Sequence, residues 1–153
     1  MNFLVAGLNY RTAPTELLER VSVNDRNLPD LLLQLQKQLG ETVVLSTCNR
    51  TQIYTTGEDL DSARARLIAS LGGMADLNED EVSAVAYVYE GDAAVRHAIR
   101  VTCGLDSMVI GEHQIAGQVQ TALRLAGEAG SVDTPLSRLF HYSLRSSRRI
   151  REA

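Results

Sequence analysis

The chain has 153 residues, 44% hydrophobic and 22% charged, which suits one ordinary globular domain with its own core. Its formal net charge of -4 argues against a dedicated nucleic-acid-binding protein, which is usually basic. No apolar run approaches the roughly 20 residues that span a bilayer. Two cysteines are too few for a disulfide framework, so we expect a reducing, cytoplasmic compartment and free thiols.

The first forty residues predict one strand followed by two helices. Residues 3–6 form a short apolar run that ends at Gly7, typical of a buried strand, and they lack the charged lead of a signal peptide. We expect Thr12 to cap a short helix that runs through residue 20. A second helix is expected to begin at Asn24 or Asp25 and to end at Gly40.

The middle of the chain predicts three strands and two helices. Residues 43–45 and 52–54 are β-type runs on either side of five polar residues, which predicts two strands with a tight connection. Leucines from Leu60 onward predict a helix that ends at the pair of glycines 72–73. Residues 82–89 alternate like a strand, and Asp92 is expected to cap the helix that follows.

Two helices are predicted for the C-terminal part. The first runs from Glu112 to Gly130 and shows the clearest helical periodicity of the chain. The second begins at residues 134–135 and is still helical, with a charged end, at residues 148–152, which indicates a cut through a longer protein. Strands that interleave with helices place the chain in the α+β class, as an α/β-type sandwich with a small ferredoxin-like sheet and a C-terminal helix leading out of the domain.

The sequence Ser-Thr-Cys-Asn-Arg at 46–50 is the first candidate for chemistry. A cysteine in a polar turn after a buried strand is unusual, because free cysteine prefers apolar interiors. A nearby cation such as Arg50 favours the nucleophilic thiolate. A lone cysteine is nonetheless more often structural than catalytic, so the residues by themselves indicate only a candidate reactive thiol at Cys48.

A second polar segment, residues 104–115, carries Asp, Ser, Glu, His and Gln around a glycine-bounded apolar strip before a helix. Helix N-termini attract anions through unpaired N–H groups. The ordinary interpretation is a capped loop in which Asp106 or Ser107 is a turn residue and Glu112 lies in the first helical turn.

Three sequence blocks resemble the signature blocks of glutamyl-tRNA reductases. They are GLNYRTAP at 7–14, VVLSTCNRTQIY at 43–54 and GLDSMVIGEHQIAGQV at 104–119, in the order and at the spacing of that family. The resemblance covers the chain from end to end and is to the N-terminal catalytic domain, which we expect at residues 1–153. The first block departs from the family at Tyr10, where histidine is common.

The resemblance implies an NADPH-dependent oxidoreductase that reduces glutamyl-tRNA to glutamate-1-semialdehyde, the first step of five-carbon tetrapyrrole (porphyrin) biosynthesis. A cysteine attacks the glutamyl ester to give a thioester, which accepts hydride more readily than an ester does and so splits one hard reduction into two easier steps.

The resemblance also assigns site residues. It implies Cys48 as the nucleophile and His97 as a second catalytic residue, either orienting the substrate or donating a proton to the leaving ribose oxygen. Arg50 is expected to hold the glutamyl carboxylate, which a guanidinium fork matches better than lysine does. Glu112 is expected to receive the substrate's α-ammonium. The other implied substrate-binding residues are Thr47, Asn49, Ser107, His113, Gln114 and Gln118.

His97 also has a simpler interpretation, since a lone helical histidine is more often a hydrogen-bonded structural group. Cys103 is expected to be a small buried residue, and His113 stands at a position that varies in the family. No metal-ligand spacing is present, so we expect no metal.

The family also implies an NADPH-binding domain and a dimerisation domain, and no G-x-G-x-x-G follows a strand in this chain. By itself the chain is therefore expected to form the thioester but to reduce nothing. The expected partners are glutamyl-tRNA, a second copy in a full-length homodimer, and the downstream glutamate-1-semialdehyde aminomutase, with no membrane. Two alternatives remain at this point: a non-catalytic module that binds tRNA or a partner, and a redox sensor that uses Cys48 and Cys103.

Overall fold

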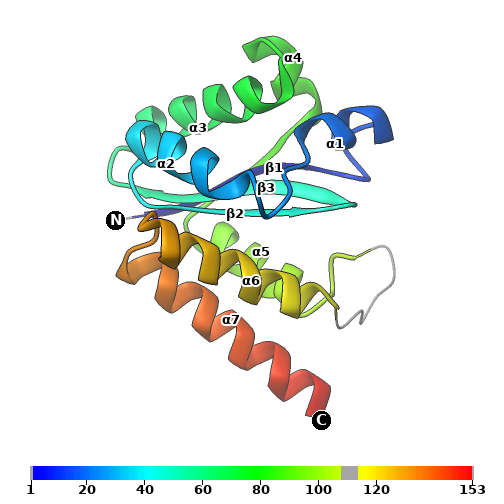
Figure 1. Ribbon diagram of the computed structural model, residues 1–153, viewed down its shortest axis with the longest axis vertical. Helices are drawn as coiled ribbons and strands as arrows, with labels where there is room; N and C mark the ends of the chain where they lie inside the picture. Colours follow the sequence, from blue (N-terminus) through cyan, green and yellow to red (C-terminus); the bar gives the residue numbers. More distant parts are fainter. Residues whose placement is uncertain (1, 108–113, 153) are drawn as a thin grey trace.

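The computed structural model describes residues 2–107 and 114–152 and has three layers (Figure 1). The middle layer is a sheet of β1 (Asn2–Asn9), β2 (Thr42–Thr47), β3 (Arg50–Gly57) and β4 (Tyr87–Glu90), in the order β2-β3-β1-β4. One face is covered by α1 (Thr15–Val21), α2 (Leu28–Leu39), α3 (Leu60–Ala75) and α4 (Glu79–Val85). The other is covered by α5 (Asp92–Thr102), α6 (Gln114–Ala129) and α7 (Thr134–Glu152).

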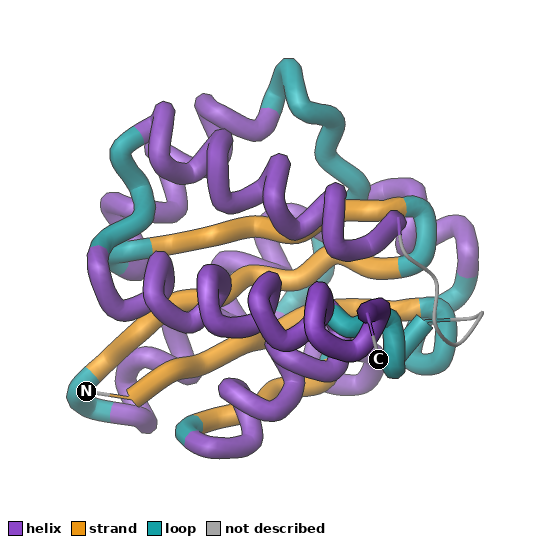
Figure 2. Tube along the Cα trace, turned by 90° about the horizontal axis from the view of Figure 1, so that it is seen from below, coloured by secondary structure: helices purple, strands orange, loops and turns teal. Residues whose placement is uncertain are grey.

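The connectivity confirms the predicted ferredoxin-like sheet. Through β4 the chain runs strand, helices, strand, strand, helices, strand, and all neighbouring strands are antiparallel. Helices α5, α6 and α7 then return to the open face, which makes the sandwich that the sequence predicts. Figure 2, seen from their side, shows the four strands running behind these helices.

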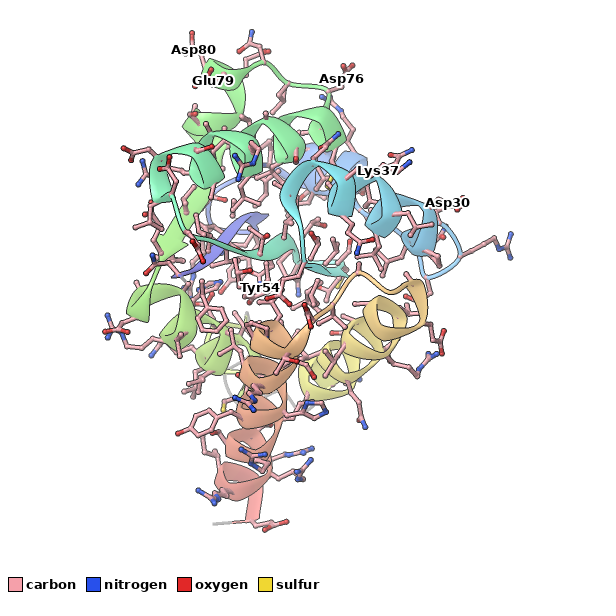
Figure 3. All side chains as sticks on the ribbon, turned by 90° about the vertical axis from the view of Figure 1, so that its left-hand side faces the viewer. Asp30, Lys37, Tyr54, Asp76, Glu79 and Asp80 are labelled. Atoms are coloured by element: carbon pink, nitrogen blue, oxygen red, sulfur yellow. The ribbon has the colours of Figure 1, made fainter. Side chains whose placement is uncertain are left out.

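The core forms on both faces of the central strand β1. Leu4, Val5, Ala6 and Leu8 are all fully buried, as expected for a strand covered on both sides rather than for one that alternates between core and solvent. Helices cover both faces of β3 as well, so successive residues of this strand contact different helical layers. Ile53 points to one helical layer, and Tyr54 packs edge-to-face on Phe140 of α7 with ring centroids 4.8 Å apart. Figure 3 shows Tyr54 inside the molecule, close to the start of α7.

The strand predicted for residues 82–89 is half wrong, because its first part is helix α4. Asn78 caps this helix in a reciprocal capping box with Glu81, and acidic residues in the first turn favour its N-terminus. The strand β4 keeps only Tyr87–Glu90. The apparent alternation arises because Val85, the last residue of α4, continues the spacing of Tyr87 and Tyr89 in β4.

The predicted end of α3 is also wrong, because the helix passes through both glycines and ends at Ala75. Asp76 then takes the left-handed conformation at φ 56°. Gly72 is a packing residue rather than a stop. A Cβ at this position would lie 2.9 Å from the carbonyl oxygen of Leu77, so only glycine lets the chain fold back this closely.

Several predicted helix starts shift. Thr12 does not cap α1, which begins at Thr15 after Pro14, and α2 begins at Leu28 rather than near Asn24. The α5 cap position is Gly91, with Asp92 the first helical residue. The predicted start at Glu112 lies outside the described residues, within which α6 begins at Gln114.

The last turns of α7 extend past the rest of the molecule, as predicted for a helix that leads out of the domain (Figure 1). Among the helices of the described residues, none combines the length and the apolar character that crossing a membrane requires.

Candidate active site

Cys48 lies in the two-residue turn of the β2–β3 hairpin. Thr47 and Arg50 pair across the strands, so Cys48 and Asn49 alone make the connection. The Thr47 hydroxyl accepts a hydrogen bond from the Asn49 N–H at 3.2 Å. Cys48 is exposed, and both it and Cys103 are free thiols. The turn therefore holds a thiol at the tip of a rigid hairpin, in reach of solvent.

The loop after β1 is tied to this turn. The Tyr10 N–H donates to the Asn49 carbonyl at 3.0 Å. Asn9 is nearly buried, and its side-chain oxygen accepts from the N–H groups of Arg11 and Thr12 at 2.9 and 3.1 Å. Such local asparagine bonds fix a loop in one conformation. Residues 7–14, the first sequence block, thus pack beside the turn of the second block, residues 43–54.

The Arg50 side chain points from the turn into the interior, where it pairs with Asp106 of the third block. Its side chain is only 3% exposed. One Nη donates to the Asp106 carboxylate at 3.2 Å, and the other donates to the Asp106 main-chain carbonyl. Arg11, which is 57% exposed, donates to the other carboxylate oxygen at 3.2 Å. Two guanidinium groups therefore share one carboxylate, which leaves one positive charge in excess.

Gly104 brings Asp106 to this position. At φ 76° it takes the left-handed conformation just after α5, and the Leu105 N–H closes the end of the helix on the Arg100 carbonyl at 2.9 Å. Asp106 is therefore a partner of Arg50 and Arg11, not only the turn residue that the sequence suggests. The three blocks, far apart in sequence, meet at one end of the sheet.

A small cavity of about 50 Å³ opens at Cys48, and it gathers most of the predicted site residues. Its lining comes from the hairpin, from the end of the α5–α6 connection and from α6: Thr47, Cys48, Asn49, Arg50, Ser107, Gln114, Ile115 and Gln118. Two predicted residues, Glu112 and His113, lie outside the described residues. His97 is not part of this lining.

His97 belongs instead to a buried polar network on the same face of β3. Gln52 is fully buried, and its amide nitrogen donates to the Tyr54 hydroxyl at 2.6 Å. The Gln52 amide oxygen accepts from the Tyr87 hydroxyl and lies 2.9 Å from His97 Nε2. Since that oxygen can only accept, His97 carries its proton on Nε2. The rings of Tyr89 and Tyr87 lie 4.7 and 5.2 Å from the His97 ring.

Burial is the main cause of the pKa shifts in this network. It lowers the pKa of His97 to about 4, against an opposing pull from the Asp106 carboxylate, so the ring is neutral at pH 7. Burial likewise raises the pKa values of Tyr54 and Tyr87 well above their usual value. These groups therefore act as neutral hydrogen-bond partners.

Gly7 makes the network possible. It pairs with Gln52 on one side and with Tyr87 on the other, so it lies between them in the sheet. A Cβ on Gly7 would lie 2.7 Å from the Gln52 Cβ and 2.8 Å from the Tyr87 hydroxyl. Because Gly7 has no side chain, the Tyr87 side chain can cross β1 and donate its hydrogen bond to Gln52 on β3.

Cys103 confirms its prediction, since it is buried and its pKa is raised by that burial. Sequence reasoning missed five residues that shape the site: Asn9, Arg11, Gln52, Tyr87 and Asp106. One signal could have found Gln52, because Arg50, Gln52 and Tyr54 alternate in a strand and so share one face. Asp106 depended on a contact between distant segments that no local pattern encodes.

Within the described residues, no three His, Cys, Asp or Glu side chains come together in a way that could hold a metal ion. All neighbouring strand pairs there are antiparallel, whereas a dinucleotide-binding fold is built on parallel strands. The described strands therefore do not form that parallel dinucleotide-binding fold.

The model of the family "Glutamyl-tRNAGlu reductase, N-terminal domain" matches residues 6–153. A glutamyl-tRNA reductase of Priestia megaterium is 42% identical over 142 residues, which cover 92% of this chain and 32% of that protein. One of Pseudomonas syringae pv. syringae is 42% identical over 153 residues, or 99% of this chain and 36% of that protein. The solved structure of glutamyl-tRNA reductase from Methanopyrus kandleri matches with a TM-score of 0.77 at 32% identity, over 98% of this chain and 34% of that one. The chain thus spans about a third of the length of these relatives.

Proposed function

The chain belongs to the glutamyl-tRNA reductase family, and on that premise we propose that it is the domain in which Cys48 takes glutamate off its tRNA as a thioester. The family is one of oxidoreductases of tetrapyrrole biosynthesis. The overall reaction proposed for the whole enzyme is the NADPH-dependent reduction of glutamyl-tRNA to glutamate-1-semialdehyde. The observation that carries the proposal is the exposed thiol in a two-residue turn, with the other two signature blocks packed beside it.

The covalent step needs only the thiol and the ester. The Cys48 thiolate attacks the carbonyl carbon of the glutamyl ester, and a carbon–sulfur bond forms as the carbon–oxygen bond to the ribose breaks. The ribose oxygen leaves and takes up one proton, which balances the proton that the Cys48 thiol gave up to become a thiolate, and the glutamyl group stays on sulfur. An exposed turn suits this step, since a bulky substrate can approach Cys48 without opening the core.

Arg50 supports recognition of the glutamyl carboxylate. It lines the cavity at Cys48, and the excess positive charge of Arg11, Arg50 and Asp106 favours an anion there. A cavity of about 50 Å³ is well below the size of ligand pockets, so a glutamyl group enters only if neighbouring side chains shift. Thr47, Asn49, Ser107, Gln114 and Gln118 would then contact the substrate, while Glu112 and His113 stay predictions from the resemblance.

For His97 we favour the orienting role. A proton donor at neutral pH must be protonated in advance, and a histidine with a pKa near 4 is not. Its Nε2–H is committed to Gln52, beneath the strand that carries Arg50. His97 would therefore hold the base of the site rather than supply the leaving group's proton.

We place hydride transfer outside this chain. In the proposal, residues 1–153 form the thioester domain, and NADPH binding and dimerisation belong to the remaining two thirds of the longer relatives. Contact with the aminomutase that uses the product would likewise belong to the whole enzyme.

The test is single-turnover deacylation of glutamyl-tRNA by this chain and by Cys48→Ser. Serine is nearly isosteric, but its hydroxyl is negligibly ionised without an adjacent base, so the variant should fold and release no glutamate. Near wild-type deacylation by Cys48→Ser would remove Cys48 as the nucleophile. Tight tRNA binding without any deacylation by the wild type would favour a binding module instead.

A further inference from the structure

A second cavity adjoins the cavity at Cys48 and has the size of a ligand pocket, about 350 Å³. It lies between residues 44–46 of β2, Leu28 of α2 and one face of α6. Gln114 and Gln118 line both cavities, so a molecule in the larger one lies one side chain away from the space at Cys48. We call it the β2-edge pocket, and we propose that it binds the terminal adenosine of glutamyl-tRNA. This inference rests on the function proposed above.

The reaction itself requires a nucleoside site at this distance. The carbonyl carbon that Cys48 attacks is bonded to an oxygen of the terminal ribose, and that ribose carries adenine. The nucleoside must therefore lie next to the thiol while the bond forms, and ordering it there lowers the barrier. Gln114 and Gln118, which line both spaces, stand where the ribose would pass from one to the other.

The strand edge in this pocket offers unused main-chain groups. Alternate residues of an edge strand turn N–H and C=O away from the neighbouring strand. Thr42 does so and is capped, because its N–H donates to the Ser131 carbonyl at 2.7 Å and its carbonyl accepts from the Ser131 hydroxyl at 2.9 Å. By the same alternation Val44 and Ser46 face outward, and the described residues supply no hydrogen-bond partner for their main-chain groups there. Val44 is only 1% exposed, so the groups that a ligand reaches without a shift of the surroundings are those of the half-buried Ser46.

Those groups match adenine. The base presents an N6–H donor beside the N1 acceptor, and the outward C=O and N–H of one edge residue can pair with both. The walls suit a flat base with apolar faces, since Val23, Leu28 and Val44 lie in the lining beside polar Gln118 and Thr121. The edge is thus closed at Thr42, and its accessible outward groups are those of Ser46 inside the pocket.

Gly117 is the position from which the β2-edge pocket can be tested, because it lies in the pocket lining. Gln114, Gly117, Gln118 and Thr121 fall on one face of α6 and line the pocket. A glycine inside a helix is destabilising, and a Cβ built on Gly117 meets nothing within 4 Å. An added Cβ is therefore free at Gly117, as it is at Gly127 of the same helix, but only Gly117 lies in the lining of the β2-edge pocket.

The chain offers a matched pair of variants. Gly117→Leu fills the pocket from a position where an added Cβ meets nothing within 4 Å, and helix propensity favours leucine over glycine, so we expect the variant to fold. Gly127→Leu is the control. It lies on the same helix, meets nothing within 4 Å, and does not line the pocket.

The first experiment titrates adenosine into the 153-residue chain and follows the backbone amide resonances of Val44, Ser46 and Gly117. Inosine is the matched probe, because it has adenosine's size but carries N1–H and O6 in place of N1 and N6–H. We expect adenosine to shift these resonances and to bind at least about ten-fold more tightly than inosine. Gly127→Leu should keep this response and Gly117→Leu should lose it. Unchanged adenosine binding in Gly117→Leu, or no shift in the wild type, would overturn the proposal.

The second experiment separates this proposal from the thioester function. Glutamyl transfer to Cys48 is measured with glutamyl-tRNA and with glutamate α-ethyl ester, which lacks the nucleoside. Gly117→Leu should raise KM for glutamyl-tRNA by about ten-fold or more and leave the rate with the ethyl ester within about two-fold of wild type. Equal KM values for glutamyl-tRNA in both proteins would contradict the pocket assignment. If the wild type forms no adduct with either substrate, the thioester function fails, and the adenosine titration alone decides the pocket.

Discussion

The two ends of β3 differ sharply, although they share one strand and one face. At its start, the turn with Cys48 is exposed and borders the cavity of about 50 Å³. Two to four residues further on, Gln52 and Tyr54 are fully buried in a network with Tyr87 and His97 whose polar atoms satisfy one another. The first region is accessible to a substrate, and the second is held in place by burial and hydrogen bonds.

Arg50 connects the two regions. It lines the cavity at Cys48, yet its side chain is as buried as the network and is held by Asp106. The reactive turn therefore depends on a fixed base. The strand β3 sets the position of Arg50, and β3 is held by the buried network that Gly7 permits. Substitutions at the two ends should therefore fail in different ways.

Arg50→Lys should have the largest effect on activity of any substitution that keeps the Cys48 thiol. Lysine keeps the charge but loses the planar fork, so it cannot hold Asp106 and a substrate carboxylate together. Charge-assisted bonds are worth roughly 1.5–3 kcal/mol each, which predicts a loss on the order of 10 to 100-fold or more in kcat/KM for glutamyl transfer. The measurement is single-turnover deacylation.

Arg11→Lys is the control for this prediction, because Arg11 is exposed and makes one contact with the same Asp106. It should change the rate only slightly.

The wild type should also reject glutaminyl-tRNA, whose neutral amide leaves the guanidinium without a counter-charge. Equal rates for the two tRNAs would remove Arg50 from the recognition of the carboxylate.

Gly7→Ala tests the buried region. The new Cβ would lie 2.7 Å from the main-chain oxygen of Thr51 as well as from Gln52, so the sheet must shift. We expect a loss of roughly 1–3 kcal/mol or more in the free energy of unfolding, measured by denaturant titration. Gly73→Ala is the matched control, since its Cβ meets nothing in a helix interior, and it should be neutral or stabilising. Equal effects in the two variants would contradict the role given to Gly7.

His97 should make stability depend on pH. Its folded-state pKa of about 4 lies below its unfolded value of 6.5, so between these values the unfolded chain binds the extra proton. Stability from this residue is complete above pH 6.5 and declines as pH falls toward 4, by roughly 3 kcal/mol at most. His97→Gln should show a correspondingly shallower decline between pH 7 and 4. Parallel curves for the two proteins would show that His97 is not held neutral by burial.

Cys103→Ser should have the smallest effect. The residue is buried at the end of α5 and lines none of the cavity at Cys48. We expect a stability loss on the order of 1–2 kcal/mol and unchanged glutamyl transfer. A folded variant that lacks transfer activity would shift the chemistry, or a redox role, toward Cys103.

The contrast between the two regions also explains what sequence reasoning could predict. The turn at Cys48 was predictable because β-type runs flank five polar residues, and the ferredoxin-like sheet followed from the order of strands and helices. Residues 82–85 were assigned to a strand because Val85, at the end of a short capped helix, continues the alternation of Tyr87 and Tyr89. The network and the Arg50–Asp106 pair escaped because each joins residues 35 to 56 positions apart, and only the folded sheet brings them together.

The most direct test of the central claim is the intact mass of the wild-type chain after incubation with glutamyl-tRNA. We predict a mass increase of one glutamyl group that hydroxylamine removes, as expected for a thioester, and that is absent from Cys48→Ser. Arg50→Lys should accumulate the same adduct more slowly. A wild-type chain that stays unmodified while glutamyl-tRNA is intact and bound, or an adduct that persists in Cys48→Ser, would contradict the account.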